Sequence, residues 1–226
     1  MSKLRAIHVS DTHGHFKDLQ GYAEIVVHSG DFCPDLFAFH AGHLNKVANE
    51  QEAWLLKKSA FIKKWLNGKP FYFVLGNHDF INPVRFEEIL KSVGIDAHNL
   101  TEKVVSYGSV NFYGFPYIPY INGQFSYECN SNQMADRIDA MVAVSQVSYL
   151  DVIVAHSPPR GCLDYCFHQY ENFGNTGLAN ALDYKWDENT LPQAILCGHI
   201  HASHGTTIRG GVLISNAATS QNIVEI

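Results

Sequence analysis

The sequence has no run of apolar residues close to the roughly twenty that a membrane-spanning helix requires, which argues against a membrane protein. It also has no internal repeat, low-complexity tract or Gly/Ser/Pro-rich linker, so we expect a single domain over residues 1–226. Its five cysteines form no Cys-x-x-Cys pair, which favours free thiols in a reducing compartment. The first polar motif begins at Asp11, and a cleavable signal peptide would remove it. We therefore expect a cytoplasmic protein.

Basic residues are few. Lys and Arg number 16 against 22 Asp and Glu, a formal net charge of -6 at pH 7. Proteins that bind a nucleic-acid backbone usually present a basic face, so the charge argues against nucleic acid as a partner. The sequence is compatible with a homo-oligomer. With 46% hydrophobic and 17% charged residues, the composition is ordinary for a globular protein.

Polar side chains follow several apolar, often β-branched runs of the chain. These runs predict buried strands over residues 4–9, 24–27, 71–75, 151–155 and 193–197. Each run is followed shortly by one of five polar clusters. These are Asp11 with His13, Asp31, Asn77 with His78 and Asp79, His156, and His199 with His201. A buried strand that ends in a short loop can direct such a side chain into a shared cleft. The clusters therefore predict one site built from five strand ends.

The residue types of these clusters are ligands of divalent metals. Asp and Asn oxygens and His nitrogens suit manganese, iron or zinc rather than thiophilic metals. Asp11 and His13 can reach one ion together, and His199 and His201 can supply one imidazole to each of two ions. The two carboxylate oxygens of Asp31 can bridge a pair of ions. The set predicts a binuclear metal centre, with five unrelated loop motifs as the alternative.

Helices and strands alternate along the chain. Apolar spacing predicts helices over residues 51–67, 83–93, 131–145 and 176–184. Further strands are predicted over residues 205–208, 211–215 and 222–226, with a tight hairpin turn at Gly210-Gly211. This pattern predicts an α/β protein in which two sheets pack together with helices outside. Residues 32–49 lack periodicity and form either a lid over the site or a packed loop.

The order of the polar motifs resembles the calcineurin-like metallophosphoesterase superfamily over residues 11–201. Residues 111–123 and 156–161 resemble a narrower group, the metallophosphoesterase domain-containing proteins of the class III cyclic-nucleotide phosphodiesterase type. The resemblance implies a four-layer αββα sandwich of two mixed β-sheets and two divalent ions. It assigns one ion to Asp11, His13, Asp31 and His201. It assigns the other to Asp31, Asn77, His156 and His199, with Asp31 as the bridge.

The resemblance also implies a reaction. His78 would lie beside the substrate phosphate, and Asp79 would hold its ring by a hydrogen bond. The implied activity is hydrolysis of a small phosphodiester, with cyclic nucleotides as the candidate, by a hydroxide that bridges two metals. Residues 32–35 replace the Asp-Arg-Gly of phosphoprotein phosphatases, which argues against protein phosphatase activity. The alternatives are a nuclease or phosphomonoesterase on the same site, and a non-catalytic scaffold that retains the fold.

Residues near the motifs favour a diester over a monoester. Arg160 is the one nearby cation, whereas a second substituent would find the apolar and aromatic side chains of Phe115, Tyr117 and Tyr120. A monoester carries about two negative charges and needs more cationic contacts. Two other histidines, His8 and His28, lie inside predicted strands, and we interpret them as core or sheet-face residues.

Overall fold

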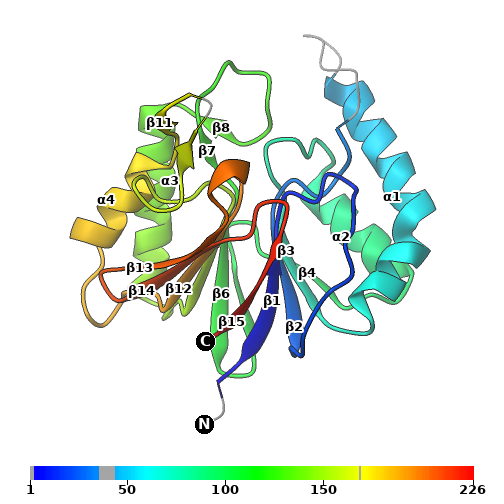
Figure 1. Cartoon of the computed structure of the whole chain (residues 1–226), viewed down its shortest axis with the longest axis horizontal. Helices are drawn as coiled ribbons and strands as arrows, with labels where there is room; N and C mark the ends of the chain where they lie inside the picture. Colours follow the sequence, from blue (N-terminus) through cyan, green and yellow to red (C-terminus); the bar gives the residue numbers. More distant parts are fainter. Residues whose placement is uncertain (1–2, 36–43, 168) are drawn as a thin grey trace.

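The computed structural model describes residues 3–35, 44–167 and 169–226. Two large β-sheets pack face to face (Figure 1). The first has the strand order β15–β1–β2–β3–β4, in which β15 runs antiparallel to β1 and the other neighbours are parallel. Its strands are β1 (Arg5–Val9), β2 (Ile25–Ser29), β3 (Phe71–Val74), β4 (Ala97–Asn99) and β15 (Gln221–Glu225).

The second sheet has the order β13–β14–β12–β9–β6–β5, with antiparallel strands at both edges and parallel strands between them. Its strands are β5 (Val104–Tyr107), β6 (Val110–Phe115), β9 (Val152–Ala155), β12 (Ala194–Cys197), β13 (Gly205–Arg209) and β14 (Val212–Asn216). Two short pairs lie beyond this sheet: β7 (Ile118–Pro119) with β8 (Glu128–Cys129), and β10 (Tyr165–Cys166) with β11 (Glu171–Asn172).

Helices cover the outer faces of both sheets, which confirms the predicted four-layer αββα sandwich (Figure 1). The first sheet is covered by α1 (Leu44–Leu66) and α2 (Pro83–Ser92), and the second by α3 (Ser131–Ser145) and α4 (Thr176–Tyr184). A short 3-10 helix, η1 (His201–Ser203), follows β12. The helix α1 begins earlier than predicted, and Val47, which is buried, extends its inward face ahead of residue 51.

The core has three layers, one between the sheets and one between each sheet and its helices. In β1, Ile7 and Val9 pack in the layer that holds α1 and α2, whereas Ala6 packs in the layer between the sheets. Strands buried on both faces have continuous apolar sequences rather than alternating ones. This is why the central strands could be recognised in the sequence.

Several local predictions were also tested. The Gly210-Gly211 hairpin joins β13 and β14 as predicted, and all five cysteines are free. The strand β6 was not predicted, although its residues include part of a motif used for the family resemblance. Residues 44–49 of the predicted lid or loop belong to α1, while residues 36–43 lie outside the described part of the chain. Within the described ranges, no helix has the length and apolar character of a membrane span.

Candidate metal centre

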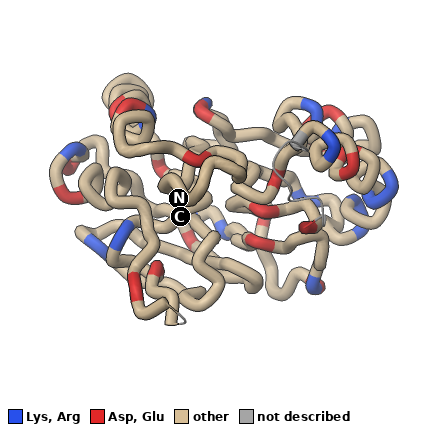
Figure 2. Tube along the Cα trace, turned by 90° about the horizontal axis from the view of Figure 1, so that it is seen from above, with Lys and Arg blue, Asp and Glu red and all other residues tan. Residues whose placement is uncertain are grey.

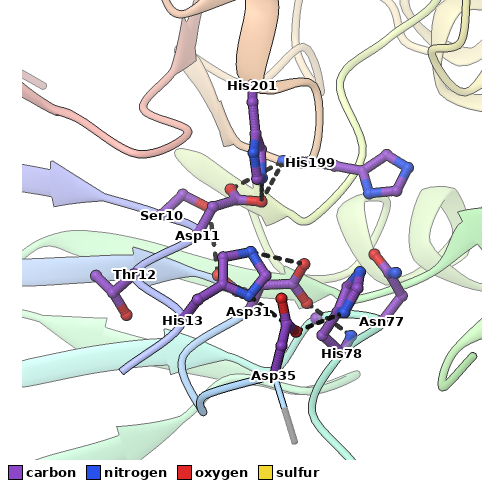
Figure 3. A network of polar contacts seen from close by, with 12 residues as sticks. Ser10, Asp11, Thr12, His13, Asp31, Asp35, Asn77, His78, His199 and His201 are labelled. Carbon is purple, nitrogen blue, oxygen red and sulfur yellow. Dashed lines mark hydrogen bonds and ion pairs between the residues drawn. The ribbon is translucent and has the colours of Figure 1, made fainter. Parts of the chain in front are cut away.

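The predicted ligands meet where strands of both sheets end. The strands β1, β2 and β3 are parallel in the first sheet, as are β9 and β12 in the second. Their carboxyl ends face the same edge of the sandwich, and a close view shows the polar side chains gathered there (Figures 1 and 3). The crevice at the carboxyl ends of parallel strands is the usual ligand site of α/β sheets. At this crevice Asp11 contacts His201, although the two residues are 190 positions apart in the chain.

The ligand loops have strained backbones. Positive φ angles occur at four predicted ligands, Asp11 (53°), His13 (45°), Asp31 (56°) and His199 (66°). Non-glycine residues in this region cost of the order of 1–3 kcal/mol each and persist only where the surrounding structure enforces them. All four residues lie in the loops that directly follow β1, β2 and β12.

Two glycines leave room for the carboxylates. A Cβ atom on Gly198 would lie 2.1 Å from Oδ2 of Asp11, and one on Gly76 would lie 2.2 Å from Oδ1 of Asp31. Both distances are far below van der Waals contact, so any larger residue would displace a carboxylate. The glycines of these motifs are therefore a packing requirement of the site.

Asp11, His13 and His201 form one group whose ligand atoms lie within 4.8 Å of one another. Nε2 of His201 lies 3.0 Å from Oδ1 of Asp11, and the backbone N–H of His199 donates to the same carboxylate. Both ring nitrogens of His13 are buried and face carboxylates, with Nδ1 3.2 Å from Oδ1 of Asp35 and Nε2 3.8 Å from Oδ2 of Asp31. An imidazole buried between carboxylates is the kind of donor set that a cation can occupy.

Asp31 lies between this group and a second set of side chains. Its Oδ2 lies 3.8 Å from Nε2 of His13 and 3.3 Å from Nε2 of His156. Nε2 of His156 also lies 2.9 Å from Oδ1 of Asn77, and Nδ1 of the same ring donates to the carbonyl of Ser29 over 2.8 Å. Because Nδ1 keeps its proton for that bond, Nε2 is the nitrogen available to a metal.

His199 stands at the side of this cluster. Its ring centroid lies 5.1 Å from that of His156, and the ring points away from the carboxylate of Asp11 (Figure 3). All seven predicted metal ligands are thus collected at one edge of the sandwich. Their individual roles as ligands remain predictions.

His78 reaches the same cleft, but its ring partner is not the predicted one. Nδ1 of His78 lies 2.8 Å from Oδ1 of Asp35, and Nδ1 of His13 lies 3.2 Å from the same oxygen (Figure 3). Asp35 was not predicted to belong to the site. It is a half-exposed loop residue, and its position four residues after Asp31 was the only signal that pointed to it.

The expected role of Asp79 is wrong. Its buried carboxylate accepts the backbone N–H groups of Phe32 (3.0 Å), Cys33 (2.7 Å) and Gly76 (2.9 Å), and so it does not orient the ring of His78. Unpaired N–H groups buried at a loop junction are costly, and a carboxylate satisfies three of them at once. Asp79 therefore joins the two loops that carry Asp31 and His78.

The loop of His78 is also held from behind by α1. The fully buried side chain of Gln51 donates through Nε2 to the carbonyl of His78 over 2.7 Å. Its Oε1 accepts the backbone N–H groups of Phe80 (2.7 Å) and Ile81 (3.2 Å). The first turns of α1 thus position a predicted catalytic loop, a contact that helical periodicity does not reveal.

Opposite charges accumulate in the cluster. Burial by itself would raise the pKa of Asp31, but the His156 imidazole beside it holds that pKa well below its usual range. Burial opposes charge on His156, yet Asp31 raises its pKa to about 9. Burial likewise opposes charge on His13, while Asp35 and then Asp31 raise its pKa to about 9. Buried carboxylates that keep neighbouring imidazoles protonated can also be neutralised by a divalent cation. The oxygen and nitrogen donors gathered here suit manganese, iron or zinc.

These pKa shifts predict opposite effects of pH on the metal-free fold and on metal binding. The pKa of His13 and His156 is about 9 in the folded chain against 6.5 in the unfolded one, so their stabilisation is complete below about pH 6.5 and is lost as the pH rises through 9. We expect the melting temperature of the metal-free protein to fall between about pH 7 and pH 9. Metal affinity should rise over the same interval, because the ion replaces these protons. Calorimetry at several pH values would measure both, and a melting temperature that rises over this interval would contradict the assignment.

A cleft of about 800 Å³ opens beside the cluster. Its polar side includes Asp31, His78 and His201, and its apolar wall includes Tyr120, Ile121 and Phe173. None of the described residues that line it is Lys or Arg. The cleft thus combines metal-ligating groups with an apolar surface large enough for more than a phosphate group.

Two of the three side chains expected to receive a second substituent are not available to it. Phe115 and Tyr117 are 1% and 9% exposed, because they pack in the core layer against α3. Only Tyr120 lines the cleft. Arg160, the expected cation, donates to the carbonyl of Asn172 and is absent from the described lining of the cleft.

A four-layer αββα sandwich with carboxylate, amide and imidazole groups gathered at its strand ends has the architecture of a metallophosphoesterase. The family described as calcineurin-like phosphoesterase matches residues 4–203. The chain belongs to this family of calcineurin-like metallophosphoesterases.

More specific relatives are distant. The chain is 20% identical over 241 residues to metallophosphoesterase domain-containing protein 1 of Homo sapiens and of Mus musculus, which covers 95% of this chain and 65% of each relative. It is 24% identical over 219 residues to a probable rhamnogalacturonate lyase C of Emericella nidulans, covering 91% of this chain and 18% of that protein. The chain thus spans just under two thirds of the first two relatives.

Solved structures share the fold. One crystal structure has a TM-score of 0.71 at 13% sequence identity and covers 99% of this chain and 95% of its own. The crystal structure of TT1561 of Thermus thermophilus has a TM-score of 0.57 at 12% identity and covers 99% of both chains. At these identities the likeness is one of fold alone.

Proposed function

We propose that this protein hydrolyses a small phosphodiester with the help of two divalent metal ions. The observation that supports this most is the convergence of seven Asp, Asn and His side chains beside a cleft whose described lining contains no Lys or Arg. Membership of the phosphoesterase family supports the class of reaction. The absence of Lys and Arg from the described lining of this cleft, together with its apolar wall, supports the proposed substrate class.

The residues at the strand ends would hold the two ions. Asp11, His13 and His201 would bind one, and Asn77, His156 and His199 the other, with Asp31 shared between them. When bound, such a pair of ions lowers the pKa of a water molecule and neutralises charge on phosphoryl oxygens. The carboxylates of Asp11 and Asp31 would supply the negative charge needed to hold two cations close together.

His78 is placed to act on the substrate. Its ring lines the cleft and lies against Asp35. Burial opposes charge on this imidazole, but Asp35 and Asp31 raise its pKa, which favours the protonated ring. A protonated imidazole at this position can stabilise charge on the phosphoryl oxygens and give its proton to the leaving alkoxide. Asp35 would hold the ring in the required orientation.

The cleft favours a substrate with one negative charge. A diester carries a single charge, which the metal ions and His78 can neutralise, whereas a monoester brings about two. A second substituent would lie against the apolar wall of Tyr120, Ile121 and Phe173. A nucleotide base or another uncharged ring fits such a surface, and cyclic nucleotides are the natural first substrates to examine.

We expect kcat/KM for bis(p-nitrophenyl) phosphate to exceed that for p-nitrophenyl phosphate by at least about tenfold, because one missing contact to a charged group is worth roughly 1.5–3 kcal/mol. The metal-loaded protein would be assayed with both esters, with cyclic nucleotides and with single-stranded DNA. A clear preference for the monoester would mean that a cationic pocket has been missed. No turnover of any diester with manganese, iron or zinc would refute the proposed function.

A nuclease is the less favoured alternative. Seen from above, Lys and Arg lie mainly toward the two ends of the molecule and are interspersed with Asp and Glu (Figure 2). Proteins that follow a nucleic-acid backbone concentrate positive charge along it. A mononucleotide-sized diester makes no such demand, and it is therefore the better fit to this surface.

A further inference from the structure

Two ligand loops run side by side beyond the ends of β1 and β2. We call residues 10–14 the Asp11 loop and residues 30–32 the Asp31 loop. Backbone hydrogen bonds of 2.9 Å continue the pairing of the strands, from Asp11 N–H to the Gly30 carbonyl, from His13 N–H to the Asp31 carbonyl and from Gly14 N–H to the Phe32 carbonyl. The relative position of the loops determines the distance between the carboxylates of Asp11 and Asp31.

His28 lies at the junction of these loops. It belongs to β2, its side chain is fully buried, and its ring packs edge-on against Phe32. Nδ1 accepts the backbone N–H of Gly30 over 3.2 Å, and Nε2 lies 3.1 Å from Oγ1 of Thr12. Oγ1 of Thr12 in turn donates to the carbonyl of Phe32 over 3.3 Å. The side chain therefore connects both loops.

These contacts define the tautomer of His28. A backbone N–H can only donate, so Nδ1 must carry a lone pair, and the ring proton is on Nε2. Nε2–H then donates to Thr12, whose own hydroxyl proton is left for the carbonyl of Phe32. Every donor in this series of hydrogen bonds, from Gly30 through His28 and Thr12 to Phe32, meets an acceptor, as buried polar groups require.

We propose that His28 is a positioning residue of the metal centre, whose Nε2–H tautomer links the Asp11 loop to the Asp31 loop through Thr12 and sets the spacing of their carboxylates. Positive φ angles on both sides of the link, at Asp11 and Asp31, give the loops a tendency to relax. A side chain that joins them opposes that relaxation. The hydrogen-bonded link between the loops does not depend on the proposed function, but the effect of this link on bound ions rests on the proposed function.

His8 provides a matched control. It is also fully buried, and its ring lies between two hydroxyl groups, with Nδ1 2.8 Å from Oγ of Ser215 and Nε2 2.9 Å from Oγ of Ser29. Both partners belong to strands rather than to the ligand loops. Replacing His8 should therefore cost stability in the same manner without moving the two loops apart.

The test compares His28→Asn, Thr12→Val, the double variant and His8→Asn. Asparagine can still accept the Gly30 N–H but is too short for Thr12, and valine preserves the shape of Thr12 without its hydroxyl. Zn²⁺ binding to metal-free protein would be measured by titration calorimetry beside the melting temperature. We expect a loss of Zn²⁺ affinity of about 10–100-fold in each single variant, as for other residues that orient metal ligands. The double variant should be no worse than the singles, because both remove one link.

The control variant His8→Asn should have a lower melting temperature than the wild type and an unchanged Zn²⁺ affinity. Wild-type affinity in Thr12→Val, which preserves the packing, or an equal loss in His8→Asn, would overturn the proposal. Nitrogen NMR of metal-free wild-type protein separates the link from the function: the Nε2–H tautomer of His28 supports the link even if no Zn²⁺ binds, in which case the proposed function fails instead. The Nδ1–H tautomer would overturn the link directly.

Discussion

Asparagine in place of Asp31 is expected to abolish metal binding and, with it, phosphoester hydrolysis. The substitution preserves size and an acceptor for the His78 backbone N–H, which donates to Oδ1 over 2.8 Å. It removes the negative charge that lies 3.3 Å from Nε2 of His156 and 3.8 Å from Nε2 of His13. In the proposed arrangement two cations would then face each other without a bridging charge. Mutation of residues that only orient metal ligands lowers metal affinity by about 10–100-fold. Loss of a ligand shared by two ions should therefore lower it by more than about 100-fold.

Elemental analysis and metal titration would measure this effect. We expect two divalent ions per wild-type chain and none retained by Asp31→Asn after dialysis. Asp136→Asn is the control, since this exposed residue of α3 lies outside every contact described above. A wild-type stoichiometry of one, left unchanged by His199→Ala, would refute a binuclear centre and leave Asp31 as an ordinary ligand.

Alanine in place of His78 should have a different result: the protein keeps its metals and loses turnover by about 10²–10⁴-fold, the usual contribution of a general acid or base. The ring of His78 lies against Asp35 and lines the cleft, whereas its backbone N–H makes the contact to Asp31. Alanine keeps that backbone contact. The imidazole is therefore expected to act on the substrate rather than on the ions.

The leaving group distinguishes the roles of His78. A nitrophenolate leaves without a proton, so the loss caused by His78→Ala should be smaller for a nitrophenyl diester than for an alkyl diester. His98→Ala is the control, because this half-buried histidine of β4 pairs with Asp96 and lies away from the cleft. If His78→Ala loses its metals, the residue is a ligand and its proposed role is wrong.

Much of the fold could be predicted because its signals are local. The helices α3 and α4 begin and end at the predicted residues, since apolar spacing and the capping residues Asn130 and Asn175 act within one element. The central strands were found because burial on both faces leaves continuous apolar runs. The strand β6 was missed, and so was the start of α1, where burial of Val47 depends on contacts with other elements.

The candidate site also has features that local sequence signals predict and features that only tertiary contacts decide. The sequence by itself determined which ligand types follow which strands, since a buried strand followed by an Asp, Asn or His can be recognised within a few residues. Only the tertiary structure decided which side chains meet. It placed Asp35 rather than Asp79 against His78, buried Phe115 and Tyr117 in the core, and joined His28 to Thr12. Such contacts depend on how separate loops lie after the two sheets pack, and local periodicity carries no information about that arrangement.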